Sequence, residues 1–126
     1  MKKYTEKRPW GKFERFCLNE KCAVKILTIN PNEELSWQYH KKRAEFWRVL
    51  EGPAKIVIGE KIKTGKKDDE FFVPIGAKHQ IKAGKLSVKI LEISFGEFDE
   101  NDVVRLKDKY KRKHSPIPLR RTTKRA

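Results

Sequence analysis

The sequence lacks the features of a membrane-bound or secreted protein. No apolar run in its 126 residues is long enough to cross a bilayer, and the charged start, Met1 to Arg8, is not followed by the apolar core of a secretory signal. We therefore expect a soluble, cytoplasmic protein with no membrane partner. Its length suits one domain that can bury a core without disulfides or structural metals.

The sequence also contains few cysteines and histidines. Cys17 and Cys22 enclose a short polar segment, and no second Cys/His pair follows at the spacing of a structural zinc site. Their spacing differs from C-x-x-C, so although a redox pair is possible, we expect plain reduced thiols near a hairpin. The three histidines are His40, His79 and His114.

Charge of one sign dominates, with 31 Lys and Arg against 17 Asp and Glu and a formal net charge of +14. Such an excess can indicate a polyanionic partner, but here it is spread along the whole chain. A further share lies in residues 113–126, which hold two prolines and little apolar content. We expect a folded domain over residues 1–112 and a basic, flexible tail over 113–126, and nucleic acid is not the expected partner.

Short apolar and β-branched runs, separated by Gly, Pro and Asn turns, fill the middle of the chain. The expected strands are Ala23 to Ile29, Leu35 to His40, Phe46 to Leu50, Ala54 to Ile58, Phe71 to Pro74, Lys78 to Lys82 and Leu86 to Phe95. Many short strands of this kind favour an all-β sandwich or barrel. After them, Asp99 offers an N-cap, which predicts a short helix over Glu100 to Tyr110.

Four residues in two stretches, Leu35 to Gly52 and Val73 to His79, have the side chains of a metal site. Gln38 and His40 are two apart, so on a strand they point to the same face, and Glu45 follows a basic turn early on the next strand. His79 comes just after a Pro-x-Gly turn. Two imidazoles, one carboxylate and one amide oxygen suit zinc or a neighbouring first-row divalent ion, and thiolates are absent from the set.

The same segments resemble the two motifs of the cupin superfamily. In the first motif, Gln38 stands where many cupins have the first histidine of H-x-H, and it is followed by His40, by Glu45 and by the expected spacing to Gly52. The second motif is matched by Pro74-x-Gly-x-x-His79. The resemblance implies a double-stranded β-helix, or jelly-roll, barrel with one divalent metal ion on Gln38, His40, Glu45 and His79. Zinc is the first expectation, with manganese, iron, cobalt or nickel as alternatives.

More narrowly, the chain resembles the mannose-6-phosphate isomerase domain of type II enzymes, usually the C-terminal part of a bifunctional protein with a mannose-1-phosphate guanylyltransferase. The matching pieces are Arg8-Pro-Trp-Gly11, Leu35-Ser-x-Gln-x-His40, Arg43-Ala-Glu-x-Trp47, Ile75-Gly-Ala-Lys-His79 and Asn101-Asp-Val-Val-Arg105. The resemblance implies interconversion of mannose 6-phosphate and fructose 6-phosphate through an enediol, with a sugar phosphate as the small-molecule partner and a homodimer as a possible assembly. Lys41, Lys42 and Phe46 depart from the family, which often shows histidines there.

Three further residues are candidates for the chemistry. Arg43 and Arg105 lie inside motif segments and could contact the phosphate or sugar, because a guanidinium binds phosphate through two hydrogen bonds. Glu92 interrupts an apolar strand and is, with Arg105, a candidate catalytic residue. An edge position facing water fits Glu92 equally well. A metal-bound hydroxide or a lysine could also serve as the base. The alternative function is a non-catalytic or different-substrate cupin, such as a sugar-binding module, an epimerase or a sensor.

Overall fold

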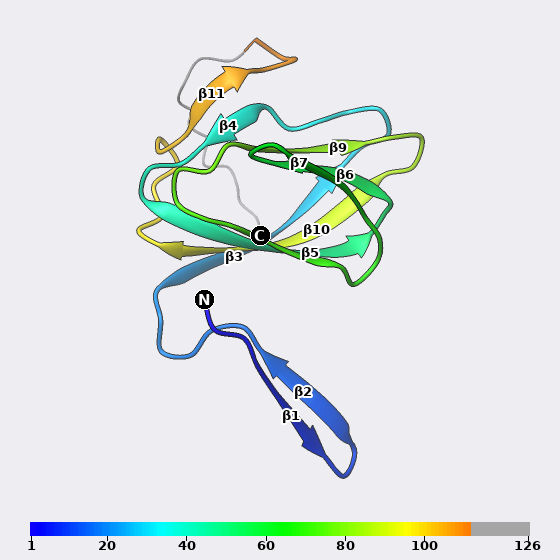
Figure 1. Cartoon of the computed structure of the whole chain (residues 1–126), viewed down its shortest axis with the longest axis vertical. Coiled ribbons are helices and arrows are strands. Elements are labelled where there is room, and N and C mark those ends of the chain that lie inside the picture. Colours follow the sequence, from blue (N-terminus) through cyan, green and yellow to red (C-terminus); the bar gives the residue numbers. More distant parts are fainter. Residues whose placement is uncertain (112–126) are drawn as a thin grey trace, which may run out of the picture.

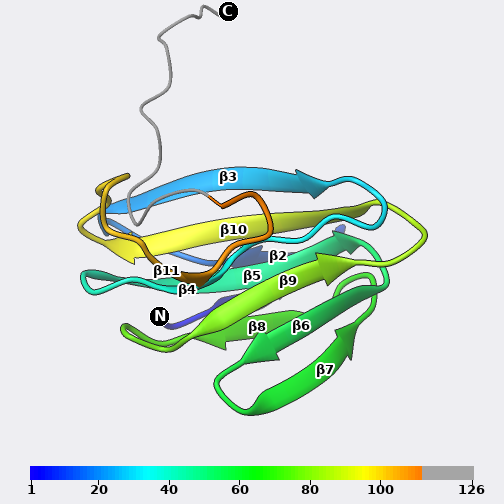
Figure 2. The ribbon, with the colours of Figure 1, turned by 90° about the horizontal axis from the view of Figure 1, so that it is seen from above.

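Two antiparallel β-sheets face each other and enclose the core, and a separate hairpin projects from them (Figures 1 and 2). The computed structural model describes residues 1–111. In spatial order, one sheet consists of β3 (Cys22–Ile29), β10 (Val88–Gly96), β5 (Arg43–Glu51) and β8 (Glu70–Val73). The other consists of β11 (Val104–Lys107), β4 (Trp37–Tyr39), β9 (His79–Ala83), β6 (Ala54–Ile58) and β7 (Lys61–Gly65).

The core forms because alternate residues of these strands point between the sheets. The four-stranded sheet contributes Trp47, Val49 and Ile90, and the five-stranded sheet contributes Ile56 and Ile81, all of them buried. The apolar residues fill one end of the barrel, whereas at the other end polar and charged side chains join apolar ones at the inward positions. That change of side-chain type along the same strands makes room for a site.

The hairpin consists of β1 (Tyr4–Arg8) and β2 (Gly11–Arg15), which pair only with each other among the described strands. It extends away from the barrel, as Figure 1 shows, and Trp10 at its turn is 72% exposed. A group of ion pairs joins its base to the outer face of the barrel, with Lys3 2.9 Å from Glu70 and Arg48 3.2 Å from Glu14. The hairpin is therefore held against the barrel mainly by ion pairs at its base.

The structure confirms the all-β class and places a strand on every predicted segment, with ends that differ by a few residues. The predicted helix over Glu100 to Tyr110 is wrong. The Asp99 carboxylate accepts the N–H of Asn101, as an N-cap would, but the chain forms a turn there and then the strand β11. Pairing with β4 and burial of Val103 stabilise the extended form over the helix.

Strands β1, β2 and β7 were not predicted, because their mostly exposed residues carry no apolar pattern that indicates a core. The predicted tail, residues 113–126, lies outside the described residues. Within residues 1–111 there is no helix, and so none that is long and apolar enough to span a membrane.

Candidate metal centre

A cavity of about 400 Å³ lies between the polar ends of the two sheets. Six of the seven predicted site residues line it, namely Gln38, His40, Arg43, Glu45, Glu92 and Arg105. The seventh, His79, is buried beside Glu45, outside the cavity lining. The chain thus brings together residues that lie up to 67 positions apart in the sequence.

Strand register explains how the five-stranded sheet supplies its part of the site. Arg105 of β11 pairs with Gln38 of β4, and Gln38 pairs with His79 of β9. Because directly paired residues point to the same face of a sheet, these three side chains form one row across the inner face. The prediction that Gln38 and His40 share a face fits this arrangement, since both line the cavity.

The four-stranded sheet supplies the acidic part. Glu92 of β10 pairs with Lys25 of β3. Glu45 of β5 pairs with Ser94 of β10, which comes two residues after Glu92 and therefore lies on the same face of the sheet. Glu92 is buried on a central strand, so the alternative in which it faces water at an edge is wrong. Its carboxylate lies 3.7 Å from the Lys25 ammonium, and both residues line the cavity.

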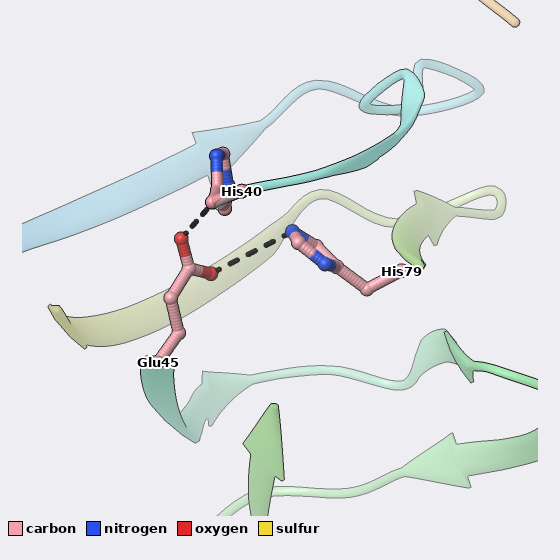
Figure 3. Close-up of side chains that lie close together, drawn as sticks. All are labelled: His40, Glu45 and His79. Atoms are coloured by element: carbon pink, nitrogen blue, oxygen red, sulfur yellow. Dashed lines mark ion pairs between the residues drawn. The ribbon is translucent and has the colours of Figure 1, made fainter. Parts of the chain in front are cut away.

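His40, Glu45 and His79 form a compact, buried group at the base of this site (Figure 3). His40 Nε2 lies 3.1 Å from Glu45 Oε2, and His79 Nε2 lies 3.8 Å from Glu45 Oε1. One ligand atom from each residue falls within 4.8 Å of the others. Ligand atoms about 2.0–2.1 Å from a tetrahedral zinc ion are about 3.4 Å apart, so the spacing fits one shared ion.

The hydrogen bonds of both imidazoles prepare them as ligands. His40 Nδ1 lies 2.6 Å from the Asp102 carbonyl oxygen, and His79 Nδ1 lies 2.9 Å from that of Ala77. A carbonyl can only accept, so each Nδ1 carries a proton and each Nε2 is the ring atom left for the site. His79 Nε2 is buried without a hydrogen-bond partner, which a metal ion would satisfy.

Burial and neighbouring charges set the protonation of the group. Burial alone would raise the pKa of Glu45, but hydrogen bonding with His40 and the charge that His79 carries in acid outweigh it and hold that pKa well below its usual range. Burial lowers the pKa of His79, so the ring stays neutral at pH 7. A carboxylate beside a neutral imidazole is the protonation state that divalent metal ions bind.

Glu92 behaves in the opposite way. Its burial, reinforced by the adjacent charge of Glu45, raises its pKa to about 8, although Lys25 and Arg43 oppose the shift. Near neutral pH Glu92 therefore carries its proton while Glu45 does not. Two carboxyl groups in one cavity thus differ in protonation, a common property of acid–base sites.

Arg43 reaches into the same group. Its guanidinium lies 3.4 Å from Glu45 Oε2, donates to His40 Nε2 at 3.3 Å and donates to the Asp99 carbonyl at 3.2 Å. It also stacks on the Phe98 ring, 4.6 Å from the centroid. Arg43 therefore lies against two of the candidate metal ligands and is not a solvated surface charge.

Two further residues of the matching segments, to which the sequence assigned no role in the site, support it. The Asp102 carboxylate accepts the N–H groups of Lys41 and Lys42 at 2.9 Å, which holds the turn between His40 and β5. Trp47, fully buried, donates its indole N–H to Glu45 Oε1 at 2.9 Å. Neither Asp102 nor Trp47 belongs to the predicted ligand set. The predicted helix over Glu100 to Tyr110 also obscured the part played by Asp102.

Comparison with known proteins identifies relatives of the whole folded part. A family model described as "Mannose-6-phosphate isomerase C-terminal" matches residues 1–108. Relatives include the mannose-1-phosphate guanylyltransferase of Escherichia coli (strain K12), 38% identical over 107 residues, and the alginate biosynthesis protein AlgA of Pseudomonas putida, 32% identical over 112 residues. These matches cover 83% and 87% of this chain but 22% and 23% of the relatives, so the chain spans less than a quarter of their length.

Solved structures show the same fold. A cupin-superfamily sugar phosphate isomerase from Silicibacter pomeroyi matches with a TM-score of 0.56 at 20% identity, covering 64% of this chain and 53% of that one. Oxalate decarboxylase from Bacillus subtilis matches with a TM-score of 0.63 at 25% identity, covering 69% of this chain and 24% of that one. These likenesses establish the cupin barrel, which hosts different reactions in the two proteins.

Proposed function

The chain belongs to the mannose-6-phosphate isomerase C-terminal family, and we propose that it is a metal-dependent isomerase that interconverts mannose 6-phosphate and fructose 6-phosphate. One observation carries the proposal: the buried group of His40, Glu45 and His79 opens on a cavity that also holds Glu92 and two arginines. Metal ligands, an acid–base group and anion-binding cations are what an aldose–ketose isomerization of a sugar phosphate needs.

In this proposal His40, Glu45 and His79, with Gln38 as a fourth ligand, hold one divalent ion, zinc being the first candidate. When bound, the ion supplies Lewis-acid stabilisation of the negative charge that develops on the substrate's oxygen atoms. The Gln38 amide oxygen accepts a hydrogen bond from the Ser36 hydroxyl at 3.1 Å, which orients it in the cavity lining. Asp102 and Trp47 keep His40 and Glu45 in place.

Glu92 would move the proton between C1 and C2 of the sugar. A shuttle must take a proton from one carbon and return it to the other, and it works best when its pKa is near the operating pH. The pKa of Glu92, raised to about 8 by burial and by Glu45, meets that condition. Glu45 is poorly suited to the task, because its low pKa and its contacts with both imidazoles commit it to the metal ion.

Arg43 and Arg105 would bind the anionic substrate. Arg43 contacts the candidate ligands, so it is placed to reach the sugar oxygens next to the metal ion. Arg105 enters the cavity from β11 at the edge of the other sheet, and we assign it to the phosphoryl group. A guanidinium can hold a phosphate through two parallel hydrogen bonds.

A coupled assay tests the proposal in both directions of the reaction. Protein reloaded with zinc or manganese should interconvert mannose 6-phosphate and fructose 6-phosphate, and a chelator should abolish the activity. Glu92→Gln should retain the metal and lose most of the turnover. A protein that binds metal in full yet turns over neither sugar phosphate would refute the isomerase and leave a sugar-binding or different-substrate cupin.

A further inference from the structure

The two cysteines of the chain meet at the junction between the hairpin and the barrel. Cys17 follows β2, Cys22 is the first residue of β3, and their sulfur atoms lie 3.4 Å apart. Four exposed residues, 18 to 21, form the turn between them. The sequence left a redox pair possible but favoured plain reduced thiols near a hairpin, since the pair does not form a C-x-x-C motif.

The surroundings fix both ends of this turn. Cys17 and Cys22 pack with Phe16 against a buried cluster of Phe46, Ile93 and Phe95 on the outer face of the four-stranded sheet. The Phe16 and Phe46 rings are 5.1 Å apart, and Cys22 of β3 pairs with Phe95 of β10. Both cysteines stay partly exposed, so a small reagent can reach them. The fold thus holds two accessible thiols next to each other.

We propose that Cys17 and Cys22 form a reversible intrachain disulfide that fastens the junction between hairpin and barrel. Residues 1–126 contain only these two cysteines, so neither can exchange its disulfide with a third cysteine of the same chain segment. The proposal stands apart from the isomerase reaction, because neither cysteine lines the cavity.

The chemistry is thiol–disulfide exchange with a low-molecular-weight disulfide such as oxidised glutathione. One cysteine loses its proton, and the thiolate attacks a sulfur of the reagent and expels one small thiol. The second cysteine, after losing its proton, attacks the protein sulfur of this mixed disulfide and expels the other. The protein loses two hydrogens and two electrons, and the small disulfide is reduced to two thiols.

The folded geometry should favour ring closure. In an unfolded chain the two sulfurs meet only as often as a short flexible loop allows. In the folded chain they already lie 3.4 Å apart, and a disulfide requires a further approach to about 2.05 Å. Contact with Cys17 and burial raise the pKa of Cys22, so exchange should be slow at pH 7 and faster at alkaline pH.

The test compares the equilibrium in glutathione redox buffers for the folded protein and for the same protein in denaturant. Thiol trapping followed by mass spectrometry measures the oxidised fraction. We expect a product lighter by two hydrogen atoms, without a glutathione adduct, and an equilibrium constant at least tenfold greater in the folded state. By linkage, the oxidised protein is then more stable, with a midpoint of thermal unfolding roughly 5 °C higher.

Single variants provide the matched control. Cys17→Ser and Cys22→Ser each keep one thiol and should give only a glutathione adduct. Hydrogen exchange should slow at residues 17–22 on oxidation of the wild-type protein and stay unchanged in both variants. A folded-state constant equal to or below that of the denatured chain would overturn the proposal. So would a wild-type product consisting of glutathione adducts or of disulfide-linked dimers.

Discussion

At the scale of single residues, the candidate site depends on protonation set by hydrogen bonding and burial. The Asp102 and Ala77 carbonyls assign the Nδ1 protons of His40 and His79, which leaves both Nε2 atoms facing Glu45. The chemistry of these side chains was evident in the sequence. Their tautomers were not, because a backbone carbonyl that accepts a hydrogen bond has no sequence signature.

Replacing His79 tests the metal centre directly. His79→Ala should lose most of the bound divalent ion, measured by elemental analysis after reloading, because loss of even an outer-shell partner costs roughly 10–100-fold in affinity and a ligand should cost at least as much. His114→Ala is the control: it removes the third histidine, which lies beyond the family match, and should leave the metal content unchanged. Absence of metal from the reloaded wild-type protein would contradict the assignment.

Glu92 should make stability depend on pH in the metal-free protein. Its folded-state pKa of about 8 exceeds the ordinary value of 4.5, so the folded state binds this proton more tightly than the unfolded state does. The contribution of the Glu92 proton to stability is therefore full below pH 4.5 and is lost as the pH rises toward 8. Glu92→Gln removes this dependence, so the variant should gain stability relative to wild type between pH 5 and pH 8.

Thermal unfolding in the presence of a chelator measures that difference. The comparison with Glu92→Gln matters because His79 also makes stability depend on pH. Its pKa is lowered in the folded state, so its contribution to stability is lost as the pH falls below 6.5, the opposite direction to that of Glu92. Glu97→Gln, which removes an exposed carboxyl group just after β10, serves as the control. A constant difference between wild type and Glu92→Gln at pH 5 and pH 8 would show that Glu92 titrates normally.

At the scale of elements, internal strands of both sheets place most of the site residues, and the edge strand β11 adds Arg105. Strand patterns predicted β3, β4, β5, β6, β8, β9 and β10, whose apolar and β-branched runs are typical of strands that cover a core. They did not predict β11, where an N-cap residue and charged positions favoured a helix. Tertiary pairing with β4 overrides that local preference and brings Arg105 beside Gln38.

The end of β10 depends on a glycine. Gly96 pairs with Arg43, has a φ of +106°, and a Cβ there would lie 2.8 Å from the Lys42 carbonyl oxygen. Gly96→Ala should therefore destabilise the fold by about 1–3 kcal/mol in denaturant unfolding and weaken metal binding, since it displaces the turn that holds His40. Gly84→Ala, where a Cβ meets nothing within 4 Å, should have little effect. Equal losses in both variants would argue against this account.

Arg105 tests the phosphate assignment on β11. Hydrogen bonds to charged groups contribute ~1.5–3 kcal/mol, so Arg105→Ala should lower kcat/KM for the sugar phosphate by roughly one to two powers of ten. Arg105→Lys should recover part of the loss, because a point charge cannot form two parallel bonds. Metal content should stay the same. Equal losses on phosphorylated and unphosphorylated sugars would place Arg105 in folding or in the chemical step.

At the scale of the whole molecule, the barrel and the hairpin differ in how they are held. The barrel has a continuous buried core and contains every residue of the candidate site. The hairpin β1–β2 contributes exposed side chains and the ion pairs of Lys3 and Glu14 at its base. The motif Arg8-Pro-Trp-Gly11 is recognisable in the sequence, but the hairpin is not, because a two-stranded sheet with little buried apolar surface has no core pattern.

This division predicts that the barrel folds and binds metal without the hairpin. A chain lacking residues 1–12 keeps Phe16, which packs against Phe46, and loses Lys3 but keeps its barrel partner Glu70. Partly exposed ion pairs contribute roughly 0–1 kcal/mol each, so denaturant unfolding should show a loss of about 1–2 kcal/mol that shrinks at high salt. Metal content should match that of the full chain, since no hairpin residue lines the cavity. If the shortened chain fails to fold or loses its metal, the hairpin is a structural part of the barrel and the division drawn from the contacts is wrong.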